Sequence, residues 1–148
     1  MSLSAFLSKN ALKVENEKIT VSNRFLSDEI DPETGKAIPM QWEIRAVTST
    51  EDEELRKSCT KRVPIPGKKN QYQMETDANM YLGRLAVACT VFPNLNDKEL
   101  QDSYGVMGAD NLLKTMLTAG EYSNLIEQIQ RICGFDSGIQ EKVDEAKN

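Results

Sequence analysis

The sequence predicts an α+β fold, with a small antiparallel N-terminal β-sheet, packed helices and a C-terminal helical subdomain. Two segments within the first 50 residues alternate apolar and polar side chains with a period of two, which is typical of strands. Later segments repeat apolar side chains at intervals of three and four, which is typical of helices. We expect one compact domain overall, with the sheet and a central helix in residues 1–92, the helical subdomain in residues 93–134 and a polar tail in residues 135–148.

The first segment, residues 2–9, places Leu3, Phe6 and Leu7 at helical spacing behind serines that can cap a helix. We expect a short helix that docks on its own domain. The alternative is an arm that folds against a partner, because chain termini are loose unless they are tied down.

Two strands are expected next. Residues 17–25 alternate with Ile19 and Val21 on one side, and residues 40–49 alternate around Trp42 and Ile44. Residues 27–39 between them contain a Pro and a Gly suited to a turn, and we interpret them as a long hairpin loop. Trp42, the single tryptophan, is expected to anchor the core; the alternative is a surface contact residue.

The sequence from Thr50 to Glu53 is a capping box, so a helix is expected to start near Glu51 and to run to Arg62 before Pro64. Residues 63–76 have two prolines and a glycine and show no regular period. Residues 71–75 at their end are expected to add a third strand to the sheet.

Asp77 can cap a helix that continues to Phe92. This helix is apolar on nearly all sides after Arg84, which predicts burial against several neighbours, and Gly83 within it allows the close approach of another backbone. Pro93 ends it.

Three shorter segments follow. Asn94 or Asn96 is expected to cap a short helix through Leu100 to Tyr104, and residues 105–108 break it at two glycines. A helix is expected over residues 110–117, and a capping box at residues 118–121 then starts the strongest amphipathic helix of the chain, which Gly134 ends.

Composition and charge exclude several classes of function. The net charge of −5 comes from the C-terminal third, since residues 1–96 hold 13 basic and 13 acidic side chains while residues 97–148 hold 5 and 10. A nucleic-acid surface needs clustered Lys and Arg, so we expect no nucleic acid as a partner. No apolar segment approaches the roughly 20 residues that cross a bilayer, and no N-terminal run of basic and then apolar residues resembles a signal peptide. We expect a cytoplasmic protein with no membrane partner.

Catalytic and metal-binding signatures are also missing from the sequence. It has no histidine, the usual acid, base and metal ligand near neutral pH. Cys59, Cys89 and Cys133 are too far apart for a metal pair and are expected to be reduced and mostly buried. Residues 27–39 lack the ligand spacing of a calcium loop, and residues 67–69 lack the flanking residues of a phosphate loop. We expect no enzyme, no cofactor and no metal.

Linked segments in the C-terminal half resemble a known family. They are PNLND-x-ELQ-x-SYG at residues 93–105, NLLKTML-x-AGEY at residues 111–122 and GFD at residues 134–136. Together with the layout of the first 75 residues, including SAFL at 4–7 and RAVT at 45–48, they make the chain similar to the XkdN-like phage tail assembly chaperones. That family occurs in phages and in prophage elements, such as the PBSX-like ones, of Gram-positive bacteria.

The resemblance implies a non-enzymatic protein that coats the tape measure protein and recruits tail tube subunits while a phage tail is built. The alternative function is a structural or adaptor component retained in the tail or baseplate. Self-association is a further option. A chaperone for amphipathic helices can offer a groove lined by Leu and Met. We therefore predict that some side chains of one set form such a groove. The alternative is that they form the core of a helix bundle. The set is Leu100, Tyr104, Met107, Leu112, Leu113, Met116, Leu117 and Tyr122.

Overall fold

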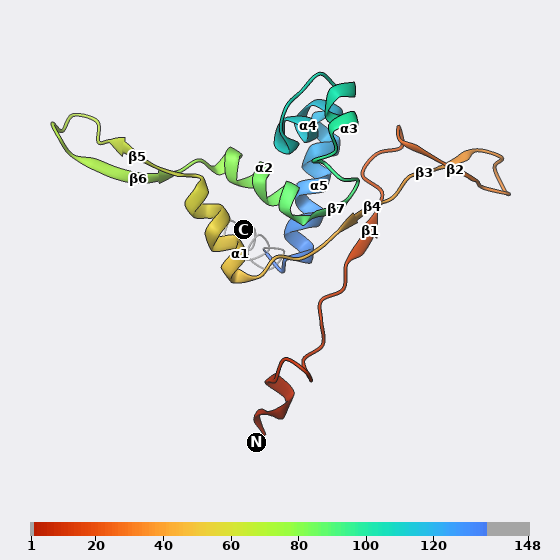
Figure 1. Ribbon diagram of the computed structural model, residues 1–148, viewed down its shortest axis with the longest axis horizontal. Coiled ribbons are helices and arrows are strands. Elements are labelled where there is room, and N and C mark those ends of the chain that lie inside the picture. Colours follow the sequence, from red (N-terminus) through yellow and green to blue (C-terminus); the bar gives the residue numbers. More distant parts are fainter. Residues whose placement is uncertain (1, 136–148) are drawn as a thin grey trace, which may run out of the picture.

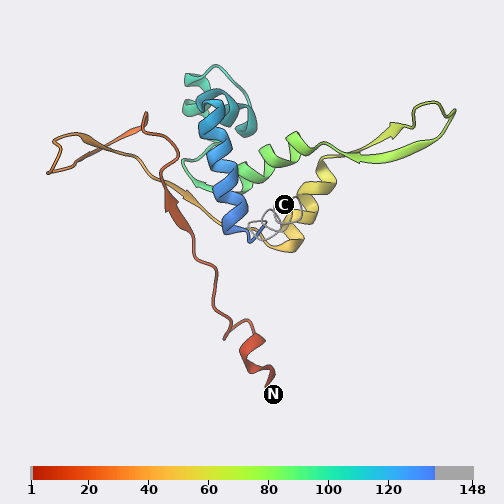
Figure 2. The same cartoon turned by 180° about the vertical axis from the view of Figure 1, so that it is seen from behind.

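The computed structural model describes residues 2–135 and confirms the α+β class. A small sheet and a group of helices form the body, and two β-hairpins leave it in opposite directions along its long axis (Figure 1). The N-terminal segment leaves in a third direction, and the view from behind shows the same arrangement (Figure 2). The polar tail expected in residues 135–148 lies, from residue 136 on, outside the described residues.

The body contains a three-stranded antiparallel sheet in the order β1 (Glu17–Ile19), β4 (Trp42–Ile44) and β7 (Thr90–Phe92). Trp42 is 2% exposed and Ile44 is fully buried, so the central strand and the role of Trp42 as a core anchor are confirmed. The prediction that residues 71–75 supply the third strand is wrong. β7 takes that position because the β-branched and aromatic run Thr-Val-Phe pairs with β4 instead of continuing the preceding helix.

Both hairpins differ from the expectation. Residues 27–39 are not a plain loop, because β2 (Leu26–Ile30) pairs with β3 (Ala37–Pro39). The helix expected to reach Arg62 ends earlier, since β5 (Thr60–Pro64) pairs residue for residue with β6 (Tyr72–Thr76). That pairing satisfies the backbone groups that a longer helix would have used.

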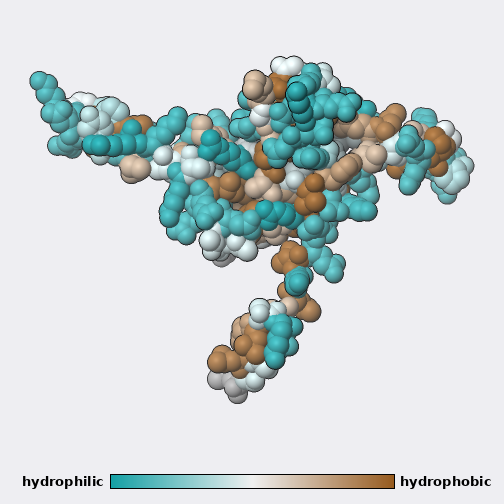
Figure 3. Space-filling model, viewed as in Figure 1, coloured by the Kyte–Doolittle hydropathy of each residue, from teal (hydrophilic) through white to brown (hydrophobic). Residues whose placement is uncertain are grey.

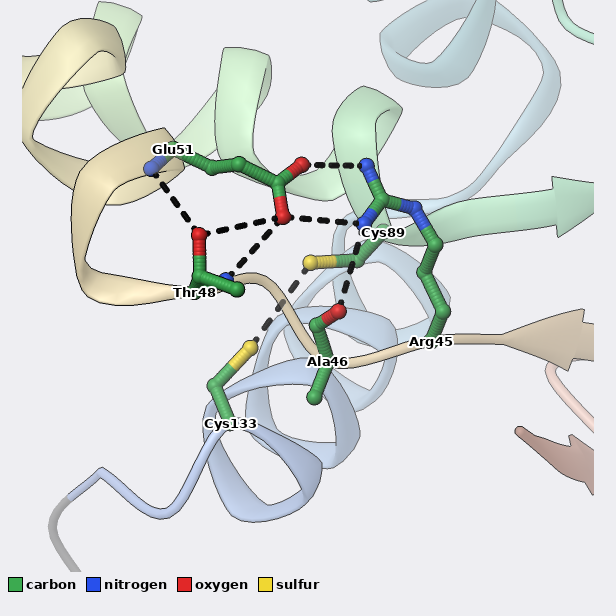
Figure 4. Close-up of polar contacts among 6 residues, drawn as sticks. All are labelled: Arg45, Ala46, Thr48, Glu51, Cys89 and Cys133. Atoms are coloured by element: carbon green, nitrogen blue, oxygen red, sulfur yellow. Dashed lines mark hydrogen bonds and ion pairs between the residues drawn. The ribbon is translucent and has the colours of Figure 1, made fainter. Parts of the chain in front are cut away.

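The helix α1 (Ser49–Ser58) begins two residues earlier than expected. Thr48 and Glu51 form the capping box, and Thr50 and Glu53 do not. Two overlapping T-x-x-E sequences could cap this helix, one at residues 48–51 and one at residues 50–53. Arg45 favours the first, because its Nη2 donates to Glu51 Oε2 at 2.8 Å (Figure 4). The carboxylate of Glu51 therefore joins the start of α1 to the end of β4.

Hydrogen bonds from the Arg45 guanidinium and the Thr48 amide lower the pKa of Glu51 from its ordinary value of 4.5 to about 2. Because this folded-state pKa lies below the unfolded value, the contact stabilises the fold above pH 4.5 and loses that effect as the pH falls toward 2. We predict that Glu51→Gln lowers the free energy of unfolding at pH 7, and that its difference from wild type shrinks at about pH 2.5. Urea unfolding at both pH values measures this; an equal difference at both contradicts it.

The other helices are α2 (Ala78–Cys89), α3 (Lys98–Ser103), α4 (Ala109–Met116) and α5 (Ala119–Ile132). Asp77 caps α2, and Thr118 with Glu121 caps α5, as predicted. The cap of α3 is Asp97, whose Oδ1 accepts from Leu100 N at 2.9 Å, and neither Asn94 nor Asn96. The Asn94 side chain instead accepts from the backbone of Asn96 and forms a turn before the helix.

One hydrophobic cluster joins the helices and the sheet, with α2 packed against α1, α4 and α5. Cys59 and Cys89 are buried and free, and Cys133 is half-buried. The sulfurs of Cys89 and Cys133 lie 3.7 Å apart, where the end of α2 meets the end of α5 (Figure 4). Burial raises the pKa of Cys89, which keeps this thiol protonated and unreactive.

Gly83 does not allow a second backbone to approach, because the atoms nearest to an added Cβ belong to the side chains of Lys114 and Tyr122, at 3.6 Å. This is ordinary contact, so a methyl group fits. We predict that Gly83→Ala raises the free energy of unfolding by about 0.5–1 kcal/mol, because Ala loses less backbone entropy in a helix. Gly105→Ala is the matched control and should destabilise the protein, since φ at this position is +66°. A loss of stability in Gly83→Ala, measured by urea unfolding, would refute the prediction.

The N-terminal segment does not dock on the described body, so the favoured interpretation of residues 2–9 is wrong. The segment projects as an arm, and its folding against a partner stays a prediction. It forms a 3₁₀ helix, η1 (Leu3–Phe6), with Leu3 79% and Phe6 81% exposed. The backbone and side-chain hydrogen bonds of residues 2–11 within the described chain are all local to that segment, for example Asn10 Nδ2 to the Ser4 carbonyl. With no polar or apolar anchor on the body, the arm extends away from it (Figure 1).

Candidate functional site

An apolar cavity of about 170 Å³ lies where the β2–β3 hairpin, the sheet and α3 meet. We call it the junction pocket. Its lining side chains are all apolar and come from six separate positions along the fold: Phe25, Met40, Trp42, Phe92 with Pro93, Leu100 and Met116. An open cavity with this lining can accept an apolar side chain and offers no charged group for chemistry.

Aromatic packing and an ion pair hold one wall of the junction pocket in place. The rings of Phe25 and Trp42 pack with centroids 6.5 Å apart. Arg24 next to Phe25 donates from Nη2 to the Met116 carbonyl at 2.8 Å and pairs with Glu121. The hydrogen bond from Arg24 holds the pKa of Glu121 well below its usual range. The contacts fix the start of the hairpin to the junction of α4 and α5.

A second, more polar hollow of about 440 Å³ lies beside the root of the β2–β3 hairpin and shares lining residues with the junction pocket. Met40 and Phe92 line both, and they are 41% and 45% exposed. Charged side chains are among the residues that line this hollow, namely Lys18, Glu29 and Glu43. Figure 3 shows tan and brown surface over β7 and along the root of the β2–β3 hairpin. The two hollows share Met40 and Phe92. Together we call them the junction groove, with the shared side chains as its floor and the charged lining side chains as its rim.

The structure separates the set of residues that the sequence singled out. Leu112 and Leu113 are fully buried, and Met116 and Leu117 are 5% and 6% exposed, so these four form core between α4, α2 and α5. For these four residues the structure therefore shows the alternative to a groove, which is bundle core. Met107 is 86% exposed.

The other three members of the set, Leu100, Tyr104 and Tyr122, pack half-buried against the core. Of all eight, only Leu100 and Met116 line the junction pocket.

Sequence reasoning missed Phe25, Met40 and Phe92 as site residues and assigned Phe25 and Phe92 to regular elements. A signal was present, because Met40 and Phe92 both adjoin a proline at the end of an element. Proline ends a strand or helix and leaves its apolar neighbour without a regular partner. Such a residue is a candidate for a contact surface.

Metal ligands do not converge within residues 2–135, where no three Cys, Asp or Glu side chains come together around one point. Over the same residues, none of the helices has the length and apolarity needed to cross a membrane.

Comparison with known proteins gives one consistent result. The model of the family described as phage XkdN-like tail assembly chaperone protein matches residues 3–147. The chain is 29% identical to the uncharacterized protein YqbN and 26% identical to the phage-like element PBSX protein XkdN, both of Bacillus subtilis (strain 168). Each match covers 99% of this chain and 93% of the relative.

A solved structure agrees with this assignment. The crystal structure of YqbN matches with a TM-score of 0.69 and 27% identity, over 92% of this chain and 98% of that one. The chain therefore belongs to the family of phage XkdN-like tail assembly chaperones.

Proposed function

We propose that this chaperone binds an amphipathic helical segment of the tape measure protein in the junction groove, and that it recruits tail tube subunits to the coated segment. It does so as a binding protein without a catalytic step, in the cytoplasm of the bacterial host. The observation that carries the proposal is an open apolar pocket in a member of a tail assembly chaperone family.

The size of the junction pocket favours a protein segment over a small molecule. Its volume of about 170 Å³ suits one or two apolar side chains, whereas small-molecule sites have roughly 300–1,000 Å³. An amphipathic helix inserts side chains at intervals of three and four residues into such grooves. The thioethers of Met40 and Met116 adapt to side chains of different shape.

The rim of the groove supports a partner with mixed charge. Glu29 and Glu43 lie on it beside Lys18. Charges at the edge of an apolar contact act mainly on association rate and orientation, and their effect weakens in salt. A helix with an apolar face and flanking basic residues fits this pattern.

Co-expression tests the proposal. The protein and the tape measure protein encoded near it should form a soluble complex, and the tape measure protein should be insoluble when made alone. Mass spectrometry of purified phage particles should then detect the tape measure protein and no chaperone. Presence of the chaperone in particles would instead support the alternative, a component retained in the tail or baseplate.

A further inference from the structure

The two hairpins carry opposite charges. The β2–β3 hairpin, residues 26–39, has four acidic side chains and one basic one; the acids are Asp28, Glu29, Asp31 and Glu33. The β5–β6 hairpin, residues 60–76, has four basic side chains and one acidic one; the bases are Lys61, Arg62, Lys68 and Lys69. We call them the acidic hairpin, with a net charge of −3, and the basic hairpin, with a net charge of +3.

These charges have no ion-pair partner within the described part of the chain. The ion pairs between residues 2 and 135 use the arginines of the body, Arg24, Arg45, Arg56 and Arg131. No charged side chain of either hairpin takes part in them. Surface charges of one sign, gathered on a projecting element, attract a partner surface of the other sign.

Each hairpin also presents exposed apolar side chains. On the acidic hairpin, Leu26 and Ile30 are 59% and 57% exposed, and a register irregularity lies between them. On the basic hairpin, Tyr72 and Met74 are 47% and 68% exposed.

The pairing of β5 with β6 places Arg62 opposite Met74, and the Arg62 guanidinium lies 4.1 Å from the centre of the Tyr72 ring. Each hairpin therefore combines exposed apolar side chains with charge mainly of one sign, and the two charges are opposite.

An isolated two-stranded hairpin is only marginally stable in water, and its outer edges carry unpaired backbone groups. Both hairpins extend beyond the body with little cover from it (Figure 1). They point in opposite directions in both views, so the two hairpins of one chain do not meet (Figure 2). Contact between them requires two copies.

We propose that copies of this protein associate head to tail, with the basic hairpin of one copy packed on the acidic hairpin of the next. The contact joins two different surfaces, so an open assembly keeps one free basic hairpin at one end and one free acidic hairpin at the other. A contact of this type builds rings if its rotation closes and open filaments if it does not. The inference concerns a second copy of this chain and does not depend on the identity of the tail protein in the junction groove.

Sedimentation velocity of the purified protein tests the contact directly. At low ionic strength we expect the weight-average sedimentation coefficient to rise with protein concentration. In about 1 M salt the Debye length falls to about 3 Å, and the rise should largely disappear. A protein that stays monomeric at low ionic strength up to high micromolar concentration would overturn the proposal.

Charge reversal then identifies the surfaces. One variant combines Lys68→Glu with Lys69→Glu, and a second combines Asp28→Lys with Glu33→Lys. All four side chains are exposed, and none of them makes a side-chain hydrogen bond in the described chain. Each variant alone should lose association by roughly tenfold or more, because hairpins of like charge then face each other.

Mixing the two variants provides the matched control. The second variant keeps the native basic hairpin and the first keeps the native acidic hairpin, so an equimolar mixture contains one native contact and should form mixed dimers. Urea unfolding of each variant should match wild type, which excludes misfolding as the cause. Association that survives in either single variant, or that fails to return in the mixture, would contradict the head-to-tail contact.

Discussion

Phe92→Asp is expected to weaken binding of a tape measure segment by about 100-fold, or about 2.8 kcal/mol. Phe92 lines both parts of the junction groove and is 45% exposed, so it is available to a partner without rearrangement. A carboxylate at this position would be desolvated against the apolar face of the bound helix. Isothermal titration with helical fragments of the tape measure protein measures the change.

Val91→Asp is the matched control for this substitution. Val91 lies next to Phe92 on β7 and is similarly exposed at 42%, but it does not line either hollow. The same charge therefore enters the same strand without entering either hollow. We expect Val91→Asp to keep affinity within about threefold of wild type. Equal losses in the two variants would show that damage to β7, and not the groove, lowers binding.

Leu112→Ala is expected to lower the free energy of unfolding by about 3–4 kcal/mol. Leu112 is fully buried between α4 and the helices packed on it, and truncation removes packing and leaves a cavity. Urea unfolding at neutral pH measures the loss. Thr115→Ala on the exposed side of the same helix should change stability by no more than about 0.5 kcal/mol. A loss below about 1 kcal/mol for Leu112→Ala would mean that this residue is not core.

The same substitution separates the two roles first considered for Leu112. A groove residue would affect partner binding with little effect on stability, whereas a core residue affects stability first. Under conditions where Leu112→Ala remains folded, we expect its affinity for the tape measure segment to stay near that of wild type.

Local signals in the sequence predicted the elements that depend on neighbouring residues. The capping box at Thr118 and Glu121 and the cap at Asp77 need only side chains within one helical turn, and the structure has both. Trp42 was placed correctly because alternation over a few residues determines which side of a strand is buried.

The elements that sequence reasoning missed depend on distant partners. Residues 60–64 form a strand only because residues 72–76 pair with them, and residues 90–92 leave the helical pattern because β4 offers a sheet edge. In the set from Leu100 to Tyr122, the spacing of the apolar residues showed that they share helix faces. It did not show that α2 and α5 cover Leu112 while leaving Met107 exposed. The junction pocket joins Phe25, Met40 and Phe92 from separate elements, and no local pattern links them.

Site-specific photo-crosslinking tests the role of the junction groove most directly. A photoreactive amino acid at position 40, in the floor of the groove, should crosslink to the tape measure protein in co-expressing cells, and mass spectrometry should place the adduct on the apolar face of a helical segment. The same probe at position 91 should give little crosslinking. Absence of a tape measure adduct at position 40, with equal or stronger crosslinking at position 91, would contradict the assignment of the groove as the binding site.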